Sequence, residues 1–302
     1  MNNLDEFYRV FKSNFLKATK QEQCTRLFHG RGKTYSGLEF FNIDYYPNAI
    51  FISIFEDQNF EAIFEMILEI VGELTPVVVQ RRYTKLVERE FFGPEITPDR
   101  FCLEGDLKFK VNLHANQNPG LFLDMKSGKK WITENSKDKS ILNLFSYTCS
   151  VSVYALKAGA SRVLNIDQKK SFLNIGRENH NVNELGENAE FRNWDVRKSI
   201  NQIAKKGPFD IVFCDPPTNQ GKSFYYKNDY KKIISKSHKL LNPNGLFVAC
   251  LNTPFESMSY LEDLFSEDER EWELVERLFS SDDFPEIDKS DGLKIVVYRL
   301  LK

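Results

Sequence analysis

The apolar positions of this chain repeat with one rhythm in its first third and with another in the remainder. In the first third, apolar residues at helical spacing predict an amphipathic helix over residues 3–18 and a second helix over 60–72. Continuous apolar runs at 50–55 and 77–79 predict two strands, whereas residues 26–46 are mixed and interrupted by glycine. This part of the chain therefore predicts a small α+β arrangement.

Two more strands are expected at 85–92 and 101–113, and they flank a segment with two prolines and a glycine. This spacing is typical of the two arms of a long hairpin. The pattern then breaks at the polar stretch 116–120, which contains a Pro-Gly pair. We therefore expect a first α+β domain over residues 1–115 and a second domain over 116–302.

Strands and helices alternate through the rest of the chain, which predicts an α/β fold with a doubly wound, mostly parallel sheet of seven strands. No clear helix separates the last two strands. The C-terminal strand is therefore expected to pair antiparallel at one edge of the sheet. The predicted strands cover residues 140–145, 162–166, 188–192, 209–214, 245–251, 272–279 and 293–300.

Composition is that of an ordinary globular protein, with 41% apolar and 28% charged residues. No apolar run is long enough to span a membrane, and the first residues lack the pattern of a signal peptide. The five cysteines are widely spaced and form no Cys-x-x-Cys pair, which favours reduced thiols and a cytoplasmic location. The four histidines lack metal-ligand spacing, so no metal is expected.

Charge is almost balanced but unevenly distributed. The net charge of −2 argues against a strongly basic nucleic-acid binder. Residues 222–239 nevertheless contain six lysines and one acid, whereas residues 256–291 contain 14 acids and three basic residues. We expect the acidic stretch to form a solvated face that points away from the lysines.

The most informative motif is Asp215-Pro216-Pro217, which directly follows the apolar run 209–214. Neither proline can donate a hydrogen bond to a sheet, so the motif ends a strand with a carboxylate and a rigid turn. Ligands of open α/β sheets bind at the carboxyl ends of the strands. The motif therefore marks a candidate site, although a plain strand terminator has the same sequence.

The turn after the first strand of this sheet has no glycine, since none occurs between residues 129 and 158. A pyrophosphate cofactor such as NAD needs a Gly-rich turn there, so it is disfavoured. Carboxylates follow the next two strands. Asp167 suits ribose hydroxyls and Asp195 suits an adenine amino group, but either residue could instead cap a helix.

Aromatic residues and lysines alternate just beyond the prolines, in a segment that includes Phe224, Tyr225 and Lys227. Aromatic rings suit base stacking, and lysines attract phosphates. A helix face with snorkelling lysines has the same composition, so the segment alone does not decide between the two.

These features together resemble the class I S-adenosylmethionine-dependent methyltransferases of the ribosomal RNA large-subunit group, and most of all the domain that forms N7-methylguanosine in 23S rRNA. The resemblance implies a Rossmann-like methyltransferase sheet, S-adenosyl-L-methionine as the cofactor and ribosomal RNA as the partner, bound in part by the first domain. A homo-oligomer stays open. The stretches that carry the resemblance are 26–28, 81–82, 111–113, 120–124, 142–148, 215–218 and 240–245.

The resemblance also implies a set of site residues. Asp215, Pro216 and Pro217 would hold the target base. We further expect RNA contacts from residues of both domains, namely Arg81, Arg82, Lys222, Phe224, Tyr225, Lys227 and Asn252. The residues implied to bind the cofactor are Phe122, Asp124, Asn143, Phe145, Tyr147, Thr148, Asp167, Asp195 and Asp215.

Two departures from the family pattern bear on function. Cys149 stands where relatives have glycine, and a side chain there would narrow the approach to the methionine part of the cofactor. Asn252 stands where enzymes that methylate cytosine C5 have a nucleophilic cysteine, and the nearby Cys214 and Cys250 end buried strands. Guanine N7 and exocyclic amines are therefore favoured over cytosine C5, and a non-catalytic RNA-binding factor stays open.

Overall fold

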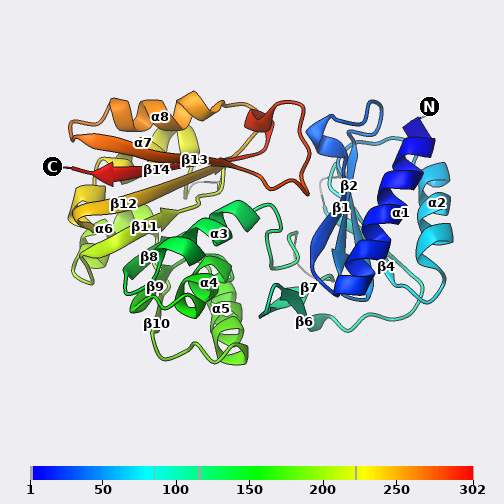
Figure 1. Cartoon of the computed structure of the whole chain (residues 1–302), viewed down its shortest axis with the longest axis horizontal. Coiled ribbons are helices and arrows are strands. Elements are labelled where there is room, and N and C mark those ends of the chain that lie inside the picture. The colour runs from blue at the N-terminus through cyan, green and yellow to red at the C-terminus, as the bar shows by residue number, and fades with distance from the viewer. Residues whose placement is uncertain (1–2, 85, 115–116, 222, 302) are drawn as a thin grey trace. The chain divides into compact units, whose positions relative to one another are not determined.

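The chain forms two compact units in a computed structural model (Figure 1). The first unit comprises Met1–Asp124 and Ser281–Asp288, and the second comprises Met125–Ser280 and Lys289–Lys302. The residues that the structure describes are 3–84, 86–114, 117–221 and 223–301.

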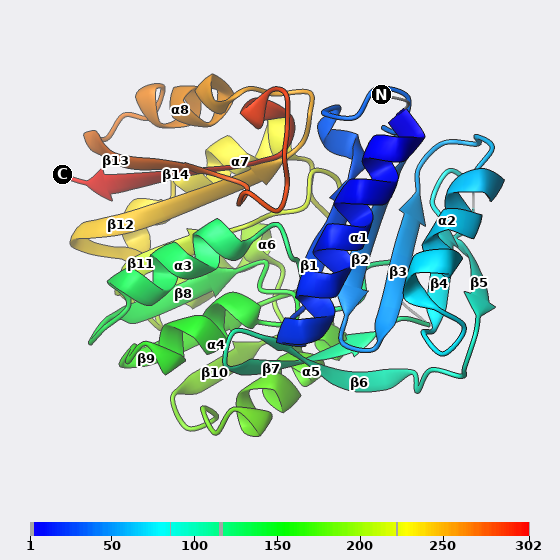
Figure 2. The same ribbon diagram turned by 45° about the vertical axis from the view of Figure 1, so that its right-hand side comes forward.

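Two helices cover one face of a five-stranded sheet in the first unit, as Figure 2 shows for α1 and α2. β3 pairs parallel with β4, and the other neighbours in the order β1-β2-β3-β4-β5 are antiparallel. Phe7, Phe11 and Phe15 of α1 pack in one apolar cluster with the buried side of α2 and with the strands, as the helical spacing predicts. The elements are α1 (Asn3–Gln21), β1 (Thr25–His29), η1 (Gly30–Gly32), β2 (Phe41–Tyr46), β3 (Ala49–Ile54), α2 (Glu61–Val71), β4 (Val77–Arg81), β5 (Glu88–Phe92), β6 (Asp99–Glu104) and β7 (Leu107–Asn112).

The long hairpin predicted from 85–92 and 101–113 is wrong. β5 pairs with β4 instead, and the hairpin consists of β6 and β7, which both lie within or next to the second predicted arm. Gly105, in the turn between β6 and β7, has a φ of 60°, a conformation that glycine adopts without steric cost. The Gly105-Asp106 pair is a turn signal between two runs of alternating apolar and polar residues. It was not recognised because the two runs together resemble one long strand.

The segment Ser281–Asp288 belongs to the first unit because its side chains pack on β1. The guanidinium of Arg26 lies 4.6 Å from the ring centroid of Phe284. His29 Nε2 lies 3.6 Å from a carboxylate oxygen of Glu286. Burial, followed by the charge of Arg26, lowers the pKa of His29 to about 2, so this ring is neutral and the contact is a polar one.

The second unit is built, within the described residues, on a seven-stranded sheet with the order β10-β9-β8-β11-β12-β14-β13. The first five strands of this order are parallel, which confirms the predicted fold class. α3 and α4 pack on one face, and α6, α7 and α8 pack on the other (Figure 1). The elements are α3 (Lys126–Asn135), β8 (Ser140–Leu144), α4 (Ser150–Lys157), β9 (Arg162–Ile166), α5 (Lys170–Val182), β10 (Ala189–Arg192), α6 (Val196–Ala204), β11 (Phe209–Cys214), α7 (Tyr226–Ile234), η2 (Ser237–Lys239), β12 (Leu241–Asn252), α8 (Met258–Ser266), β13 (Trp272–Phe279), η3 (Lys289–Asp291) and β14 (Leu293–Leu300).

The C-terminal strand is antiparallel, as predicted, but it does not lie at the edge of the sheet. β14 lies between β12 and β13 and is buried over almost its whole length. β13 takes the edge and exposes Glu273, Glu276 and Arg277. Charged side chains suit an edge strand, whereas a continuous apolar run needs a neighbour on each side. Over the described part of the chain, no helix is long and apolar enough to cross a bilayer.

Candidate active site

The carboxyl ends of the parallel strands meet at one edge of the sheet in the second unit. The chain runs outward from β8 through β9 to β10 and then returns to add β11 and β12 on the other side of β8. β8 and β11 therefore form the topological switch point, where open α/β sheets bind ligands. Leu144 is paired with both Ile166 and Cys214, so the residues after these three positions lie side by side.

A pocket at this edge is lined by three of the residues predicted from the sequence, Phe145, Asp167 and Asp195. Two of the remaining described lining residues lie beyond the prolines, and the others are direct sequence neighbours of the two predicted carboxylates. Gln168, Trp194 and Val196 could have been identified from the sequence because each is adjacent to Asp167 or Asp195. The lining residues that sequence reasoning missed are Gln168, Trp194, Val196, Gln220 and Ser223.

The carboxylate of Asp167 forms hydrogen bonds with two loops of the pocket. One carboxylate oxygen accepts a hydrogen bond from Tyr147 N at 3.0 Å, and the other accepts one from Lys169 N at 2.8 Å. Burial raises the pKa of Asp167, and the two amide donors oppose that rise. Each oxygen keeps a second lone pair, so the carboxylate can still accept from a hydroxyl group. The N-cap of α5 is Lys169, so the alternative role of Asp167 as a helix cap is not observed.

Asp195 is the N-cap of α6, so the cap predicted as an alternative is confirmed. A single oxygen, Oδ1, accepts hydrogen bonds from Arg197 N at 3.0 Å and Lys198 N at 3.3 Å. The second oxygen, Oδ2, lies 3.9 Å from Lys198 Nζ. Asp195 therefore caps a helix with one oxygen and lines the pocket at the same time.

The loop between β8 and α4 reaches the pocket without glycine. Phe145, Tyr147 and Cys149 adopt positive φ angles of 56°, 48° and 64°, which L-residues other than glycine rarely adopt. The Cys149 side chain is fully buried and packs toward α5. A Cβ atom added to Gly176 would lie 2.5 Å from Cys149 Sγ. The side chain thus occupies space that Gly176 provides, and Cys149 is not among the residues that line the pocket.

Four residues of the second unit that the resemblance implies for the cofactor are not among the described lining residues of this pocket, namely Asn143, Tyr147, Thr148 and Asp215. Asn143 is buried within the sheet and donates to Asn165 Oδ1 at 2.9 Å. Thr148 is also buried, and the ring of Tyr147 packs on Phe172 with centroids 4.5 Å apart. Two further residues of this set, Phe122 and Asp124, belong to the first unit.

The Asp215-Pro216-Pro217 turn starts where β11 ends, next to the end of β8. The hydroxyl of Tyr230 lies 3.0 Å from the carbonyl oxygens of both Cys214 and Cys250. Helix α7 thereby holds the ends of β11 and β12, which are neighbours in the sheet. The turn is fixed at the switch point by this contact.

The residues predicted to contact RNA differ in how accessible they are. Phe224 is buried and packs on Phe145 with ring centroids 5.0 Å apart, so its ring is not available to stack on a base. Tyr225 and Asn252 are exposed. Lys222 lies outside the described residues. Lys227 is exposed as well, and the last two, Arg81 at the end of β4 and the adjacent Arg82, belong to the first unit.

The expectation that the acidic stretch points away from the lysines is wrong. Lys227 Nζ lies 2.7 Å from Glu256, and Lys231 Nζ lies 2.7 Å from Glu267. Both acids belong to the stretch 256–291. They flank α8, which packs in the same apolar cluster as α7. Sequence composition could not reveal these pairs, because the partners are 29 and 36 residues apart and meet only in the folded chain.

The described lining of the pocket contains two carboxylates and no lysine or arginine. A nucleoside with a positive sulfonium group suits this lining better than a pyrophosphate, which would meet two carboxylates and no cation of the lining itself. Hydroxyl and amino groups can donate to Asp167 and Asp195, and Phe145 and Trp194 offer aromatic surface. These residues fit S-adenosylmethionine. No cluster of three or more metal-ligating side chains occurs among the residues that the structure describes.

Comparisons with known proteins agree with this geometry. A family model described as S-adenosylmethionine-dependent methyltransferase matches residues 25–299. The ribosomal RNA large subunit methyltransferase K/L of Shewanella sp. (strain ANA-3) is 35% identical over 175 residues, which cover 55% of this chain and 24% of that protein. The ribosomal RNA large subunit methyltransferase I of Tolumonas auensis is 30% identical over 221 residues, or 69% of this chain and 55% of that protein. The chain therefore matches only part of the length of these relatives.

Solved structures show the same fold. A proposed SAM-dependent methyltransferase from Streptococcus mutans has a TM-score of 0.87 at 21% identity, with 99% of this chain and 82% of that chain covered. A second proposed methyltransferase, solved with SAH, has a TM-score of 0.86 at 21% identity, again covering 99% of this chain and 82% of that chain.

Replacing Asp167 by Asn should weaken binding of S-adenosylmethionine by about 1–3 kcal/mol, because the ribose hydroxyls lose a charged acceptor. Asp210→Asn is the matched control, since this carboxylate also accepts a backbone amide, Ser140 N, but lies at the opposite end of β11. Calorimetric titration measures both affinities. Equal affinities for the two variants, with both folded by circular dichroism, would refute the role of Asp167.

The effect of Gly176→Ala on stability should change sign with the residue at position 149. In the wild type, the new methyl group would clash with Cys149 Sγ and lower the free energy of unfolding by about 1–3 kcal/mol. In a Cys149→Gly background, the clash is absent, and alanine within α5 should raise the free energy of unfolding by up to about 1 kcal/mol. Urea denaturation of the four proteins measures the coupling. The same effect in both backgrounds would show that the two side chains do not compete for space.

Proposed function

This chain belongs to the S-adenosylmethionine-dependent methyltransferase family, and from that premise we propose that it methylates a base of ribosomal RNA. The observation that carries the proposal is the position of Asp215-Pro216-Pro217 at the switch point, next to the pocket whose side chains suit the cofactor chemically. The identity of 35% to a ribosomal RNA methyltransferase supports RNA as the substrate class.

The main task of the protein in this reaction is to position the base against the methyl group of the cofactor. S-adenosylmethionine, when bound, supplies an electrophilic methyl group, so a well-oriented base nitrogen can attack it in line. Holding two reactants in this geometry is worth at most about 7–11 kcal/mol of the barrier. Asp215 would accept hydrogen bonds from the N–H groups of the base, and the Pro216 carbonyl would accept another. The rigid turn would keep both acceptors aimed at the same plane.

Guanine N7 is the target that we propose. This nitrogen carries no proton, so its methylation releases none from the attacking atom and needs no general base. The N–H edge of guanine would remain available to Asp215. An exocyclic amine is the second candidate, because the same Asp-Pro-Pro turn could polarise an amine N–H through Asp215 and the Pro216 carbonyl.

Methylation at cytosine C5 is the least supported alternative, because it requires a reactive thiolate. Cys214 and Cys250 are both fully buried. Burial, followed by the charge of Asp215, raises the pKa of Cys214 well above its usual value. The third position at which such a thiol would be expected holds Asn252.

A non-catalytic role is also less well supported than catalysis. Its main argument was that the side chain of Cys149 narrows the approach to the cofactor. Cys149 Sγ instead packs toward Gly176 of α5. The Cys149 side chain therefore fills space beside α5, so it gives no argument against cofactor binding.

The RNA is expected to contact the exposed Tyr225 and Asn252 beside the turn and residues of the first unit, including Arg81 and Arg82. Lys227 is a weaker candidate than the sequence indicates. Its ion pair with Glu256 neutralises part of the charge that would attract a phosphate.

Replacing Asp215 by Ala should lower the turnover of methyl transfer to ribosomal RNA by at least about tenfold, because one charged hydrogen bond to the base is removed. The affinity for S-adenosylmethionine should stay within about twofold of the wild type. Transfer of a labelled methyl group to ribosomal RNA from cells that lack the protein measures turnover, and calorimetry measures affinity. Loss of cofactor binding with unchanged turnover at saturation would reverse the proposed roles.

Cys214→Ser and Cys250→Ser should each retain methyl transfer within about threefold of the wild type, because neither thiol takes part in the proposed chemistry. Serine is similar in size to cysteine, so each substitution leaves a small side chain at a buried position. Thermal unfolding checks that the fold is retained. Loss of transfer in a folded variant, together with a covalent adduct on RNA that contains 5-fluorocytosine, would move the target to cytosine C5.

A further inference from the structure

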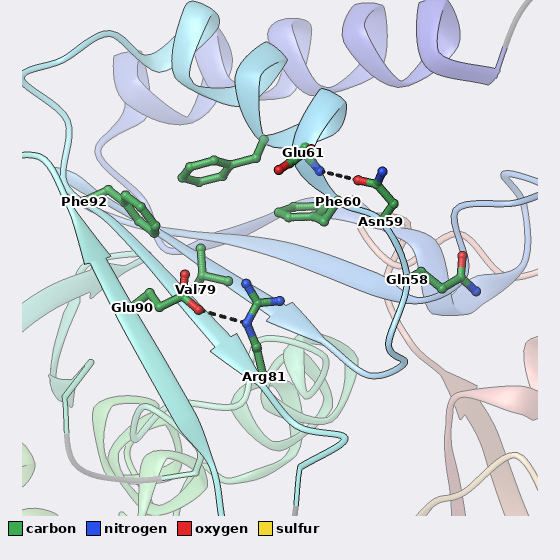
Figure 3. A pocket seen from close by; sticks show the side chains of 9 residues that line it. Gln58, Asn59, Phe60, Glu61, Val79, Arg81, Glu90 and Phe92 are labelled. Carbon is green, nitrogen blue, oxygen red and sulfur yellow. Dashed lines mark hydrogen bonds and ion pairs between the residues drawn. The ribbon is translucent and has the colours of Figure 1, made fainter.

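Stacking on a base needs an aromatic ring whose face is free of other side chains. The described lining of a cavity of about 470 Å³ in the first unit, between the start of α2 and the strands β4 and β5, does not offer one (Figure 3). Phe60 is buried, and the ring centroids of Phe64 and Phe92 are 4.6 Å apart, so these rings pack on one another. At the border, Arg81 Nε is paired with Glu90 Oε1 at 2.9 Å. An accessible ring occurs instead in the second unit, after β12.

The loop that follows β12 presents this ring at the ligand edge of the sheet. β12 lies beside β11 (Figure 1) and pairs with it in parallel, with Ala249 aligned with Cys214. Both strands therefore end at the edge where Asp215 lies. The loop begins at Thr253, directly after the strand, and Phe255 within it is 83% exposed. A ligand that reaches the Asp-Pro-Pro turn can therefore also reach this ring.

A buried lysine holds the start of the loop in place. Lys294, in β14, is fully buried. Its ammonium group donates hydrogen bonds to the carbonyls of Thr253, Ser290 and Gly292 at 2.7, 2.5 and 2.8 Å. An ammonium group has three donors, so these carbonyls satisfy all of them. A buried charge without such partners is costly, so Lys294 strongly favours this conformation of the loop.

The far end of the loop is held by α7. The carboxylate of Glu256 accepts a hydrogen bond from the hydroxyl of Tyr226 at 2.8 Å, and Lys227 Nζ lies 2.7 Å from it. Phe255 lies between two held residues, Thr253 and Glu256, and has little freedom to move. An aromatic ring that is already fixed in place loses little entropy when a ligand binds to it.

The loop that follows the two prolines adjoins the loop of Phe255. Tyr225 is paired with Asn219 in an antiparallel bridge, and Tyr226 N donates to the carbonyl of Thr218 at 3.1 Å. The hydroxyl of the same Tyr226 donates to Glu256, so one side chain joins the two loops. The segment after the prolines and the segment that carries Phe255 are therefore neighbours.

These two loops border the place proposed for the target base. Asp215 precedes the first loop by two prolines, and Gln220 within this loop lines the cofactor pocket. Phe255 stands on the second loop. A target base held by Asp215 is joined to the next nucleotides by the RNA backbone, so these nucleotides have to lie over the surface that the loops form.

We propose that Phe255 stacks on the base of a nucleotide next to the target, and that the protein thereby selects a target in a single-stranded segment of the RNA. The face of a base within a duplex is covered by its stacked neighbours, whereas an unpaired base can turn its face to an aromatic ring. Phenylalanine has no hydrogen-bonding group, so the contact tolerates any base. The inference rests on the proposed function, because it assumes an RNA substrate.

Steady-state transfer of a labelled methyl group to ribosomal RNA from cells that lack the protein tests this role. Phe255→Ala should raise the KM for RNA by about 5- to 150-fold, the value of one stacked base, and leave kcat within about threefold of the wild type. Phe255→Leu keeps an apolar side chain without a ring and should resemble the alanine variant. Phe255→Trp keeps a flat ring and should retain the KM of the wild type within about threefold.

A fluorescence measurement tests the stack without turnover. In Phe255→Trp, addition of single-stranded oligo(A) should quench the fluorescence of the introduced indole, whereas double-stranded RNA of the same length should not. The chain has three other tryptophans, so a matched control is needed. Leu74→Trp provides it, because Leu74 is 89% exposed in the turn between α2 and β4, and its fluorescence should not respond to oligo(A) beyond the response of the wild type.

Leu74→Ala is the control for the kinetic test and should keep the KM for RNA within about twofold of the wild type. Calorimetry with S-adenosylmethionine and thermal unfolding check that each variant is folded. The Phe255 variants should match the wild type in both measurements, because an exposed ring adds little to the core.

The outcomes separate the stacking role from the proposed function. If Phe255→Ala keeps the KM of the wild type and Phe255→Trp is quenched no more than Leu74→Trp, the stacking role is refuted while RNA methylation stands. An exposed ring that serves a protein partner would give this result. Equal quenching by double-stranded RNA would refute the selection of single strands. If the wild type transfers no methyl group to ribosomal RNA and Phe255→Trp is not quenched by oligo(A), the RNA substrate itself is refuted, and the stacking role with it.

Discussion

The hydrogen bonds from Tyr147 N and Lys169 N to the carboxylate of Asp167, at 3.0 and 2.8 Å, join the ends of β8 and β9 beside the switch point. One amide belongs to the turn that enters α4, and the other belongs to the turn that enters α5. The carboxylate is buried, so breaking either bond would leave a polar group without water to replace its partner. The shape of the pocket, and therefore the placement of any nucleoside in it, depends on this pair of bonds.

This constraint explains how the site is built without a Gly-rich turn. Three L-residues with positive φ carry the chain around the end of β8, and the surrounding contacts compensate for the strain. Cys149 is the clearest case, because its side chain fits only where α5 has Gly176. The absence of a side chain at Gly176 therefore accommodates the side chain at position 149. The pocket itself presents carboxylates rather than cations, which agrees with a cofactor that has no phosphate.

Much of the second unit could be predicted from the sequence because its strands are buried on both faces and appear as continuous apolar runs. Asp167 and Asp195 could be identified because each follows closely after a strand. The prediction of a long hairpin was wrong because Gly105 divides the run 101–113, which looks continuous in the sequence. Phe224 was misjudged as accessible and Lys227 as a charge without an acidic partner, because the contacts with Phe145 and Glu256 form only in the folded chain. Gln220 and Ser223 carry no pattern of their own, and only the three-dimensional arrangement brings them to the pocket.

The central claim is that a base in ribosomal RNA receives its methyl group at the Asp215-Pro216-Pro217 turn. The most direct measurement maps modified nucleotides by mass spectrometry in ribosomal RNA from cells without the protein, complemented by either the wild type or Asp215→Ala. We predict that one methylated nucleotide, a 7-methylguanosine, is missing without the protein, returns with the wild type and stays reduced with the variant. An unchanged set of methylated nucleotides in all three strains would contradict the claim.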